Sequence, residues 1–183
     1  MLVFSLVWLI LLDRFDFNEA ANRRYNFEVL NLTCSRRGAV LKDMKCSFAE
    51  IATNRYSIDV YMSLTRQLAQ NAEVAMKIYI QPPNGDKILQ FLNVKLNICE
   101  TLKRQNIAVP MIRSIVNEIM RKSNVPFSCP IVKDFVYNLT NFILTDSIFP
   151  VYTFFVNFNF TLNFMNDYKS FAELLLEGRT VPK

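Results

Sequence analysis

The sequence predicts a mainly β protein: an antiparallel β-sandwich with one amphipathic helix inserted between Cys99 and Cys129. Alternation of apolar and polar residues, the period of a half-buried strand, recurs along most of the chain. Helical spacing of apolar residues occupies one substantial segment, which lies between those two cysteines. The chain has 183 residues, 51% of them hydrophobic and 20% charged, which is enough for one domain with a sizeable core.

The N-terminal segment MLVFSLVWLILL is strongly apolar and is followed by Asp13. It is too short to cross a membrane, which takes about 20 residues, but it has the length of the apolar core of a secretory signal peptide. We therefore expect residues 1–21 to be a signal peptide, cleaved near Ala20 and Ala21, and residues 22–183 to form a single secreted domain. A buried N-terminal strand is the alternative.

The first strand of the domain is expected over residues 25–33. Its inward face would carry Tyr25, Phe27 and Val29. A polar turn separates Cys34 from Cys46, which predicts a hairpin whose ends are cross-linked.

Three further strands are expected over residues 55–65, 72–80 and 87–98, because apolar residues alternate with polar ones in each. The inward residues would be Tyr56, Ile58, Val60, Met62 and Leu64; Val74, Met76, Ile78 and Ile80; and Leu92, Val94, Leu96 and Ile98. The sequence PPNGD at residues 82–86 is a strong turn signal. The second and third of these strands should therefore form an antiparallel hairpin.

A helix is expected over residues 110–122. Its apolar face would consist of Met111, Ile112, Ile115, Val116, Ile119 and Met120. Pro110 is tolerated in a first helical turn, and Arg121 and Lys122 suit the C-terminal end. We expect this to be the sole sizeable helix.

Strand patterning resumes after Cys129-Pro130. Residues 131–144 should form a strand whose inward face carries Phe135, Tyr137 and Leu139. Residues 152–164 alternate most regularly, and so long a strand should contain a bend or bulge. Residues 171–178 are compatible with a last strand or a short helix.

The four cysteines agree with secretion, because an even number in an extracellular chain indicates a disulfide framework. Zinc binding is disfavoured by the lack of CxxC spacing and of histidine. Three pairings are possible in principle. We favour Cys34–Cys46 and Cys99–Cys129, because each closes a local loop, and the second would tie the helix to the sheet. Each is worth about 3 to 4 kcal/mol in the chain-entropy model.

Three Asn-x-Ser/Thr sequons begin at Asn31, Asn138 and Asn159. Such sequons also occur by chance in an asparagine-rich chain, so each alone is weak evidence for N-glycosylation. We expect all three on outward, polar faces of strands, where a glycan can be attached.

Several functions are disfavoured by composition. Without histidine the chain lacks Ser-His-Asp and Cys-His catalytic machinery and the commonest metal ligand. Its carboxylates lie mostly at outward or turn positions, where solvated surface charges are usual. The net charge of +5 is spread along the chain without a block of like charges, so a nucleic-acid partner is not expected. We expect no catalytic residue, metal or cofactor.

The order of these features is itself informative. They are a Tyr-x-Phe strand ahead of Cys34, Cys46 soon after it, a strand running into Cys99, an amphipathic helix, NVPFSCP at residues 124–130 and PVY at residues 150–152. This order, over residues 25–178, resembles a large secreted insect family of unknown function that includes the CheB chemosensory proteins. That family is similar to the ML lipid-recognition domains. One departure is Val151, where many relatives carry glycine.

The resemblance implies an immunoglobulin-like sandwich whose sheets admit lipid, and hydrophobic-ligand binding connected in some members with taste or pheromone detection. We therefore expect a secreted, non-enzymatic binding protein for a hydrophobic molecule or lipid, with a chemosensory receptor or another extracellular protein as a further partner. Candidate cavity-lining residues are Met62, Met76, Phe91, Phe154, Phe158 and Phe160, although each could instead fill the core.

The alternative function is an extracellular protein-interaction module with a filled core and no ligand cavity. Its contacts would then lie on the outer faces, where Phe155, Tyr61 and Tyr79 are the candidate aromatic residues. An interior cavity of about 300 Å³ or more would favour ligand binding over this alternative.

Overall fold

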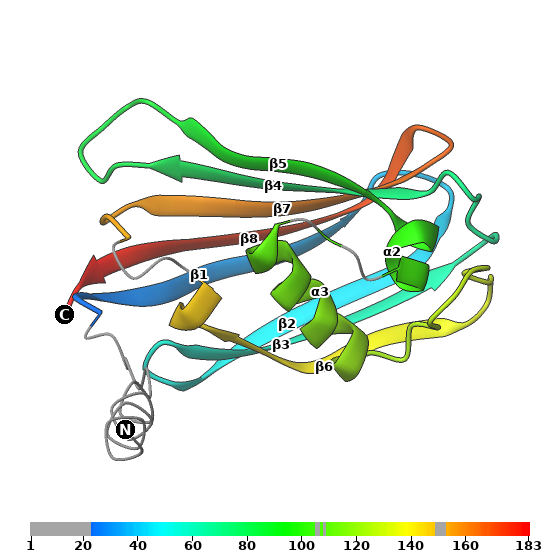
Figure 1. Cartoon of the computed structure of the whole chain (residues 1–183), viewed down its shortest axis with the longest axis horizontal. Helices are drawn as coiled ribbons and strands as arrows, with labels where there is room; N and C mark the ends of the chain where they lie inside the picture. The colour runs from blue at the N-terminus through cyan, green and yellow to red at the C-terminus, as the bar shows by residue number, and fades with distance from the viewer. Residues whose placement is uncertain (1–22, 105–106, 108, 149–152) are drawn as a thin grey trace, which may run out of the picture.

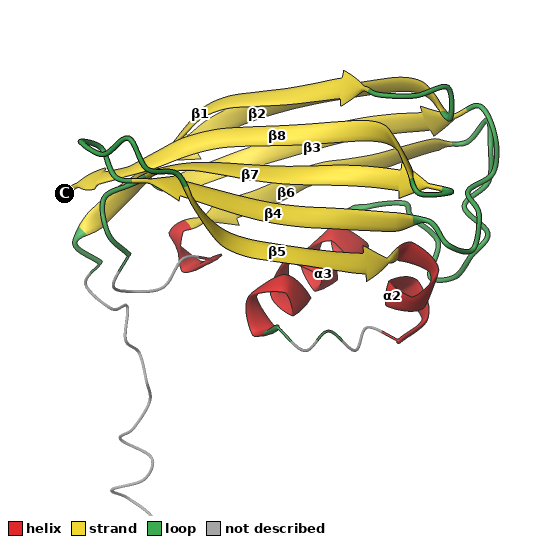
Figure 2. Ribbon diagram, turned by 90° about the horizontal axis from the view of Figure 1, so that it is seen from above, coloured by secondary structure: helices red, strands yellow, loops and turns green. Residues whose placement is uncertain are grey.

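A computed structural model describes residues 23–104, 107, 109–148 and 153–183, so the expected signal peptide lies outside the described residues. Two antiparallel sheets face each other, one of five strands in the order β1-β8-β7-β4-β5 and one of three strands in the order β2-β3-β6. Figure 1 shows the two layers, and Figure 2 shows the helices gathered at one edge of them. The predicted mainly β sandwich is confirmed.

The strands and helices have the following bounds. The strands are β1 Tyr25–Arg36, β2 Leu41–Ala52, β3 Arg55–Leu64, β4 Glu73–Gln81, β5 Leu89–Asn97, β6 Val136–Thr145, β7 Asn157–Asn166 and β8 Lys169–Pro182. The helices are α2 Ile98–Arg104, α3 Pro110–Lys122 and the short 3-10 helix η1 Asp146–Ile148. The segment predicted as either a strand or a helix after residue 170 is therefore a strand, and the hairpin of β4 and β5 is confirmed.

The two disulfide pairings are confirmed, but the hairpin predicted around the first one is wrong. Cys34 and Cys46 are bonded with their Cα atoms 6.0 Å apart. However, β1 pairs with β8 in the larger sheet, whereas β2 pairs with β3 in the smaller one. The chain therefore crosses from one sheet to the other between Arg36 and Leu41. The bond therefore ties the two sheets together.

The helical region is close to the prediction but contains one more element. Helix α3 has the expected bounds, and its buried face consists of Ile112, Ile115, Val116 and Met120. The helix α2 was not predicted: strand β5 ends at Asn97, and Ile98, expected on a strand, is the first helical residue. Asn97 caps this helix, since its Oδ1 accepts a hydrogen bond of 2.9 Å from the backbone N of Glu100. Cys99, within α2, is bonded to Cys129.

A bulge in β1 decides where the first sequon points. Tyr25, Phe27 and Val29 are buried, as predicted. Asn31 has the same parity as these residues, so a regular strand would turn it inward, and the expectation that it faces outward does not follow from alternation. The register instead shifts between Val29 and Asn31, which leaves Leu30 unpaired. Asn31 is consequently exposed, and its Nδ2 donates a hydrogen bond of 2.9 Å to Oε2 of Glu177.

A second bulge, in β6, determines its inward face. Val60 pairs with Leu139 and Ile58 with Phe142, so two residues of β6 oppose Asp59. Oδ1 of Asp59 accepts a hydrogen bond of 2.8 Å from the backbone N of Asn141, which has a positive φ of 53°. Because of this bulge, Phe142 and Leu144 turn inward after Tyr137 and Leu139. The predicted inward position of Phe135 is wrong, since it precedes the strand and is 43% exposed.

Strand β7 is shorter than predicted. It begins at Asn157, so residues 153–156 precede the strand instead of forming part of it. Residue 152, where the strand was expected to begin, lies outside the described residues. Thr180 holds the preceding segment away from the strand direction. Its Oγ1 accepts from the backbone N of Val156 at 2.9 Å and donates to the carbonyl O of Phe154 at 2.7 Å. Phe154 is therefore 84% exposed rather than on an inward strand face.

Candidate ligand-binding cavities

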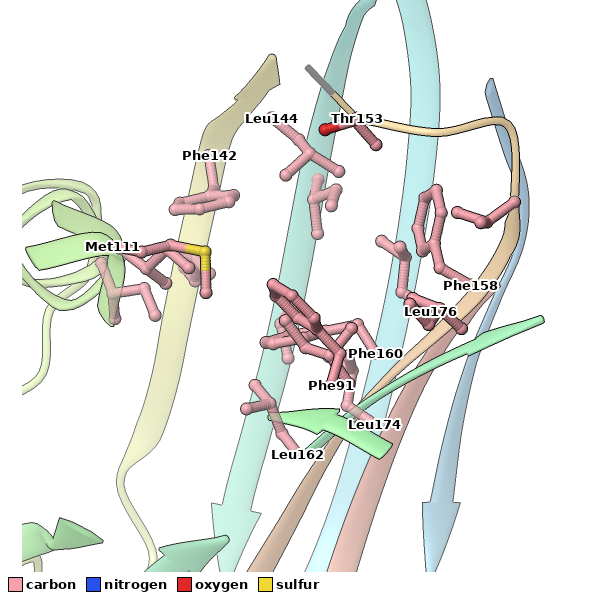
Figure 3. A pocket seen from close by; sticks show the side chains of 18 of the residues that line it. Phe91, Met111, Phe142, Leu144, Thr153, Phe158, Phe160, Leu162, Leu174 and Leu176 are labelled. Carbon is pink, nitrogen blue, oxygen red and sulfur yellow. The ribbon is translucent and has the colours of Figure 1, made fainter. Parts of the chain in front are cut away.

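An apolar cavity of about 320 Å³ lies between the two sheets. Figure 3 shows side chains from both layers and from α3 directed into it. Its lining residues are Ile58, Val60, Ile78, Ile80, Phe91, Met111, Ile115, Ile119, Leu139, Phe142, Leu144, Thr153, Phe154, Val156, Phe158, Phe160, Leu162, Leu174 and Leu176. Among these described residues Thr153 alone is polar, so the interior offers a ligand almost entirely hydrocarbon and aromatic surface.

Strand alternation builds one wall of this cavity. Phe158 and Phe160 of β7 face inward, and their direct partners on β4 are Ile80 and Ile78. Leu176 of β8 pairs with Phe160 on the other side. Every second residue of three adjacent strands is thus apolar, which produces a continuous hydrophobic wall.

The opposite wall depends on the bulge in β6, which turns Phe142 and Leu144 toward the interior. Met111 and Ile115 of α3 close the side of the sandwich at which β5 and β6 form the sheet edges (Figures 1 and 2). At the other side, the sheets are in direct contact: the rings of Phe27 on β1 and Tyr56 on β3 lie 5.1 Å apart in an edge-to-face arrangement. The interior is therefore packed beside β1 and hollow beside the helix.

A second apolar cavity, of about 220 Å³, lies between the sheets near α2. Its lining residues are Met44, Val60, Met62, Leu68, Val74, Met76, Leu96, Ile98, Thr101, Leu102, Val116, Ile119, Met120, Ser123, Val125, Ile131, Tyr137, Asn138, Leu139, Leu162, Phe164, Phe171 and Leu174. No charged residue is among the described residues that line either cavity.

The polar groups of the second cavity are largely engaged by the protein. The hydroxyl of Tyr137 accepts a hydrogen bond of 2.7 Å from the backbone N of Val132 and donates one of 3.0 Å to its carbonyl O. Burial raises the pKa of Tyr137, partly offset by the bond to Val132. Oγ1 of Thr101 donates to the carbonyl O of Asn97 at 2.7 Å. These groups are thus hydrogen-bonded within the protein and contribute little polarity to the interior.

The six predicted lining residues divide between the two cavities. Phe158 and Phe160 lie on the wall of the larger one, whereas Met62 and Met76 line the smaller one. Phe91 lines the larger cavity from a bulge in β5. Ile78 pairs with Leu92 and Tyr79 with Gln90, so Phe91 between them has no partner on β4. Its side chain is 55% exposed. Phe154 also borders the larger cavity, at its solvent side.

Three groups of lining residues were not predicted. They are Met111, Ile115 and Ile119 of α3, Phe142 and Leu144 of β6, and Leu174 and Leu176 of β8. The apolar stripe of α3 was visible in the sequence, but what that face would cover was not. Phe142 and Leu144 depend on a bulge that alternation alone does not reveal.

The three sequons differ in exposure. Asn31 and Asn159 are exposed, as expected. Asn138, by contrast, is partly buried and borders the second cavity. Its backbone N donates to Oδ1 of Asn124 at 2.8 Å, which places it beside the segment that follows α3.

Within the part of the chain that the structure describes, no three of the side chains of His, Cys, Asp and Glu gather in a way that could hold a metal ion. No described helix is both long and apolar enough to span a membrane. The fold and its interior therefore define a disulfide-linked β-sandwich with apolar cavities between its sheets.

Comparison with known proteins shows that part of this chain is similar to a described family. Residues 74–162 match a family described as a protein of unknown function, DUF1091. The matched region runs from β4 into β7 and includes α2, α3 and the Cys99–Cys129 bond. No curated protein matches the chain significantly.

Proposed function

We propose that this protein is a secreted, non-enzymatic binding protein that carries a hydrophobic molecule or lipid between its sheets. The observation that carries the proposal is the apolar cavity of about 320 Å³ beside α3. Its volume falls at the lower end of the range of about 300 to 1,000 Å³ that is usual for small-molecule sites. The resemblance to the CheB proteins and to lipid-recognition domains supports the same conclusion.

Secretion is supported by independent features. Two disulfides, Cys34–Cys46 and Cys99–Cys129, are typical of proteins that fold in an oxidising compartment. The sequons at Asn31 and Asn159 lie on accessible surface, where glycosylation can occur. The apolar N-terminal segment fits a signal peptide.

Hydrophobic burial would provide the affinity. Each methylene moved from water into the cavity contributes about 0.8 kcal/mol. Ten buried methylenes would contribute about 8 kcal/mol before the entropy loss of association, which is estimated at about 4 kcal/mol or more. The net gain of about 4 kcal/mol corresponds to a dissociation constant of about 1 mM, so micromolar binding requires about 15 buried methylenes. The mechanism is solubilisation, transport or presentation to a receptor, as in chemosensation, without a chemical step.

The test is recovery of a bound molecule. The glycoprotein would be secreted from insect cells, purified without detergent, extracted with organic solvent and analysed by mass spectrometry. An apolar fluorescent probe would be titrated into the extracted protein and then displaced. We expect a retained apolar molecule or saturable probe binding. If neither is found, the proposal is wrong.

The alternative, an extracellular interaction module, draws support from exposed aromatic rings. Tyr61 is 42% exposed and Phe155 is 43% exposed. That alternative assumed a filled core, however, so the interior cavities favour the binding of a ligand. Substituting Tyr61 and Phe155 by serine should leave probe binding unchanged if the cavity is the functional site.

A further inference from the structure

A ring of five aliphatic residues separates the two cavities. Val60, Ile119, Leu139, Leu162 and Leu174 line both of them, and each comes from a different element. Leu162 and Leu174 are direct partners in the larger sheet. Val60 and Leu139 are direct partners in the smaller sheet. Ile119 of α3 completes the ring at the side between β5 and β6, so these five residues, here termed the collar, form one cross-section of the interior.

The two cavities follow each other along the strands on either side of the collar. On β4, Ile80 and Ile78 line the larger cavity, and Met76 and Val74 line the smaller one. β7 has the same order, with Phe160 before the collar residue Leu162 and Phe164 after it. Resting on the proposed function, we infer that the cavities are two ends of one channel whose ligand is a long, unbranched, uncharged hydrocarbon chain threaded through the collar.

The length of the chain follows from the strand geometry. Phe158 and Phe164 are six residues apart, which corresponds to about 20 Å at about 3.4 Å per residue. With C–C bonds of about 1.5 Å, an extended chain advances roughly 1.25 Å per carbon, so the full channel accommodates about 16 carbons. The larger cavity alone, from Phe158 to Leu162, spans about 13 Å and accommodates about 10 carbons.

The collar can admit such a chain. Its side chains are aliphatic, so no side-chain hydrogen bond fixes their rotamers, and buried aliphatic side chains do change rotamer. An unbranched chain requires a small displacement of these side chains, whereas a fused ring system would force both sheets apart. The collar therefore selects for a thin ligand.

The charge of the ligand follows from the lining. The described residues around both cavities include no lysine, arginine, aspartate or glutamate. A charged head group inside the channel would lose its hydration without gaining a partner. An alcohol or ester should thus bind better than the corresponding carboxylate.

The experiment measures affinity against chain length. Primary alcohols of about 8 to about 18 carbons would displace an apolar fluorescent probe from the full secreted protein. In the unmodified protein, we expect affinity to rise by about fourfold per methylene up to about 16 carbons. Two variants, Ile119→Trp and Val60→Phe, narrow the collar and should end that rise near about 10 carbons. Asn117→Trp, on the exposed face of α3, is the matched control and should behave like the unmodified protein.

A second series compares alcohols with carboxylates of equal length at pH 8, where we expect the carboxylates to bind at least about tenfold more weakly. A length series that levels off near 10 carbons in the unmodified protein would overturn the continuous channel while leaving the proposed function standing. This result does not depend on whether the variants fold. Equal affinity for carboxylates would overturn the uncharged class. Failure of every alcohol and of the probe itself to bind would overturn the proposed function and the channel together.

Discussion

Gly178 of β8 lies against the ring of Phe158, which lines the larger cavity, and its replacement by alanine should destabilise the protein. Gly178 pairs with Val29 on one side and with Phe158 on the other. An added Cβ would lie 2.5 Å from the backbone O of Glu28, 2.8 Å from Cε2 of Phe158, and closer still to Cζ of that ring. Glycine therefore leaves the space in which the Phe158 ring lies against the neighbouring strand.

The size of the stability loss depends on which of the clashing atoms can move. The ring of Phe158 can rotate or shift, but the backbone of Glu28 is held in the β1–β8 ladder. Overpacking of this kind costs about 1 to 3 kcal/mol, and a clash with fixed backbone belongs at the upper end. We expect Gly178→Ala to lower the free energy of unfolding by about 2 to 3 kcal/mol. The melting temperature should then fall by about 5 to 10 °C.

Chemical denaturation under non-reducing conditions would measure this loss, because the disulfides then stay intact in both states. Gly85→Ala is the matched control, since the nearest atom to its Cβ would be Cβ of Pro82, at 3.3 Å. It should change stability by less than about 0.5 kcal/mol. The double variant Gly178→Ala/Phe158→Leu should show a coupling energy, because leucine removes the Cζ and Cε2 contacts. If Gly178→Ala and Gly85→Ala were equally stable, the argument from close packing would be refuted.

Other predictions concern the hydrogen bonds, the first disulfide and the cavity wall. Tyr137→Phe removes both bonds to Val132 and should cost about 2 kcal/mol in urea denaturation. Because burial raises the pKa of Tyr137 above 10.0, its neutral form is favoured in the folded state. Stability should therefore fall as the pH rises above about 10, less steeply in Tyr137→Phe; an identical slope would contradict this. Replacing Cys34 and Cys46 by serine should lower the free energy of unfolding by about 3 kcal/mol, and no loss would mean that the sheets need no covalent link. Phe160→Ala should weaken probe binding by about tenfold or more while the protein stays folded, because a wall of the larger cavity is lost; unchanged affinity would place the probe elsewhere.

The local elements were largely predictable because they depend on short-range periodicity. Helix α3 has the predicted bounds, and the hairpin of β4 and β5 follows from alternation on both sides of a Pro-Asn-Gly turn. The disulfide pairings also followed from chain proximity. Helix α2 escaped prediction because its residues Ile98–Arg104 continue the alternation of β5 for one position and are too few to show a helical period.

The sequence predicted the apolar character of the candidate site but not the arrangement of its cavities. An apolar, aromatic interior follows from strands whose inward positions are almost all hydrophobic. Phe158, Phe160, Met62 and Met76 do face that interior. The division into two cavities was not foreseeable, because it depends on where five side chains from separate elements meet.

The sequence by itself indicated helix α3, most of the strands and the apolar face of each up to its bulge, because these are properties of neighbouring residues; it also favoured the cysteine pairing that closes short loops. Only the tertiary structure decided which sheet each strand joins. β1 pairs with β8, so Asn31 lies beside Glu177, 146 residues away. It also decided that Cys34–Cys46 joins two sheets, that bulges at Leu30 and beside Asn141 reverse the alternation, and that α3 leaves a hollow interior. Each of these depends on long-range packing between surfaces whose local patterns fit several partners equally well.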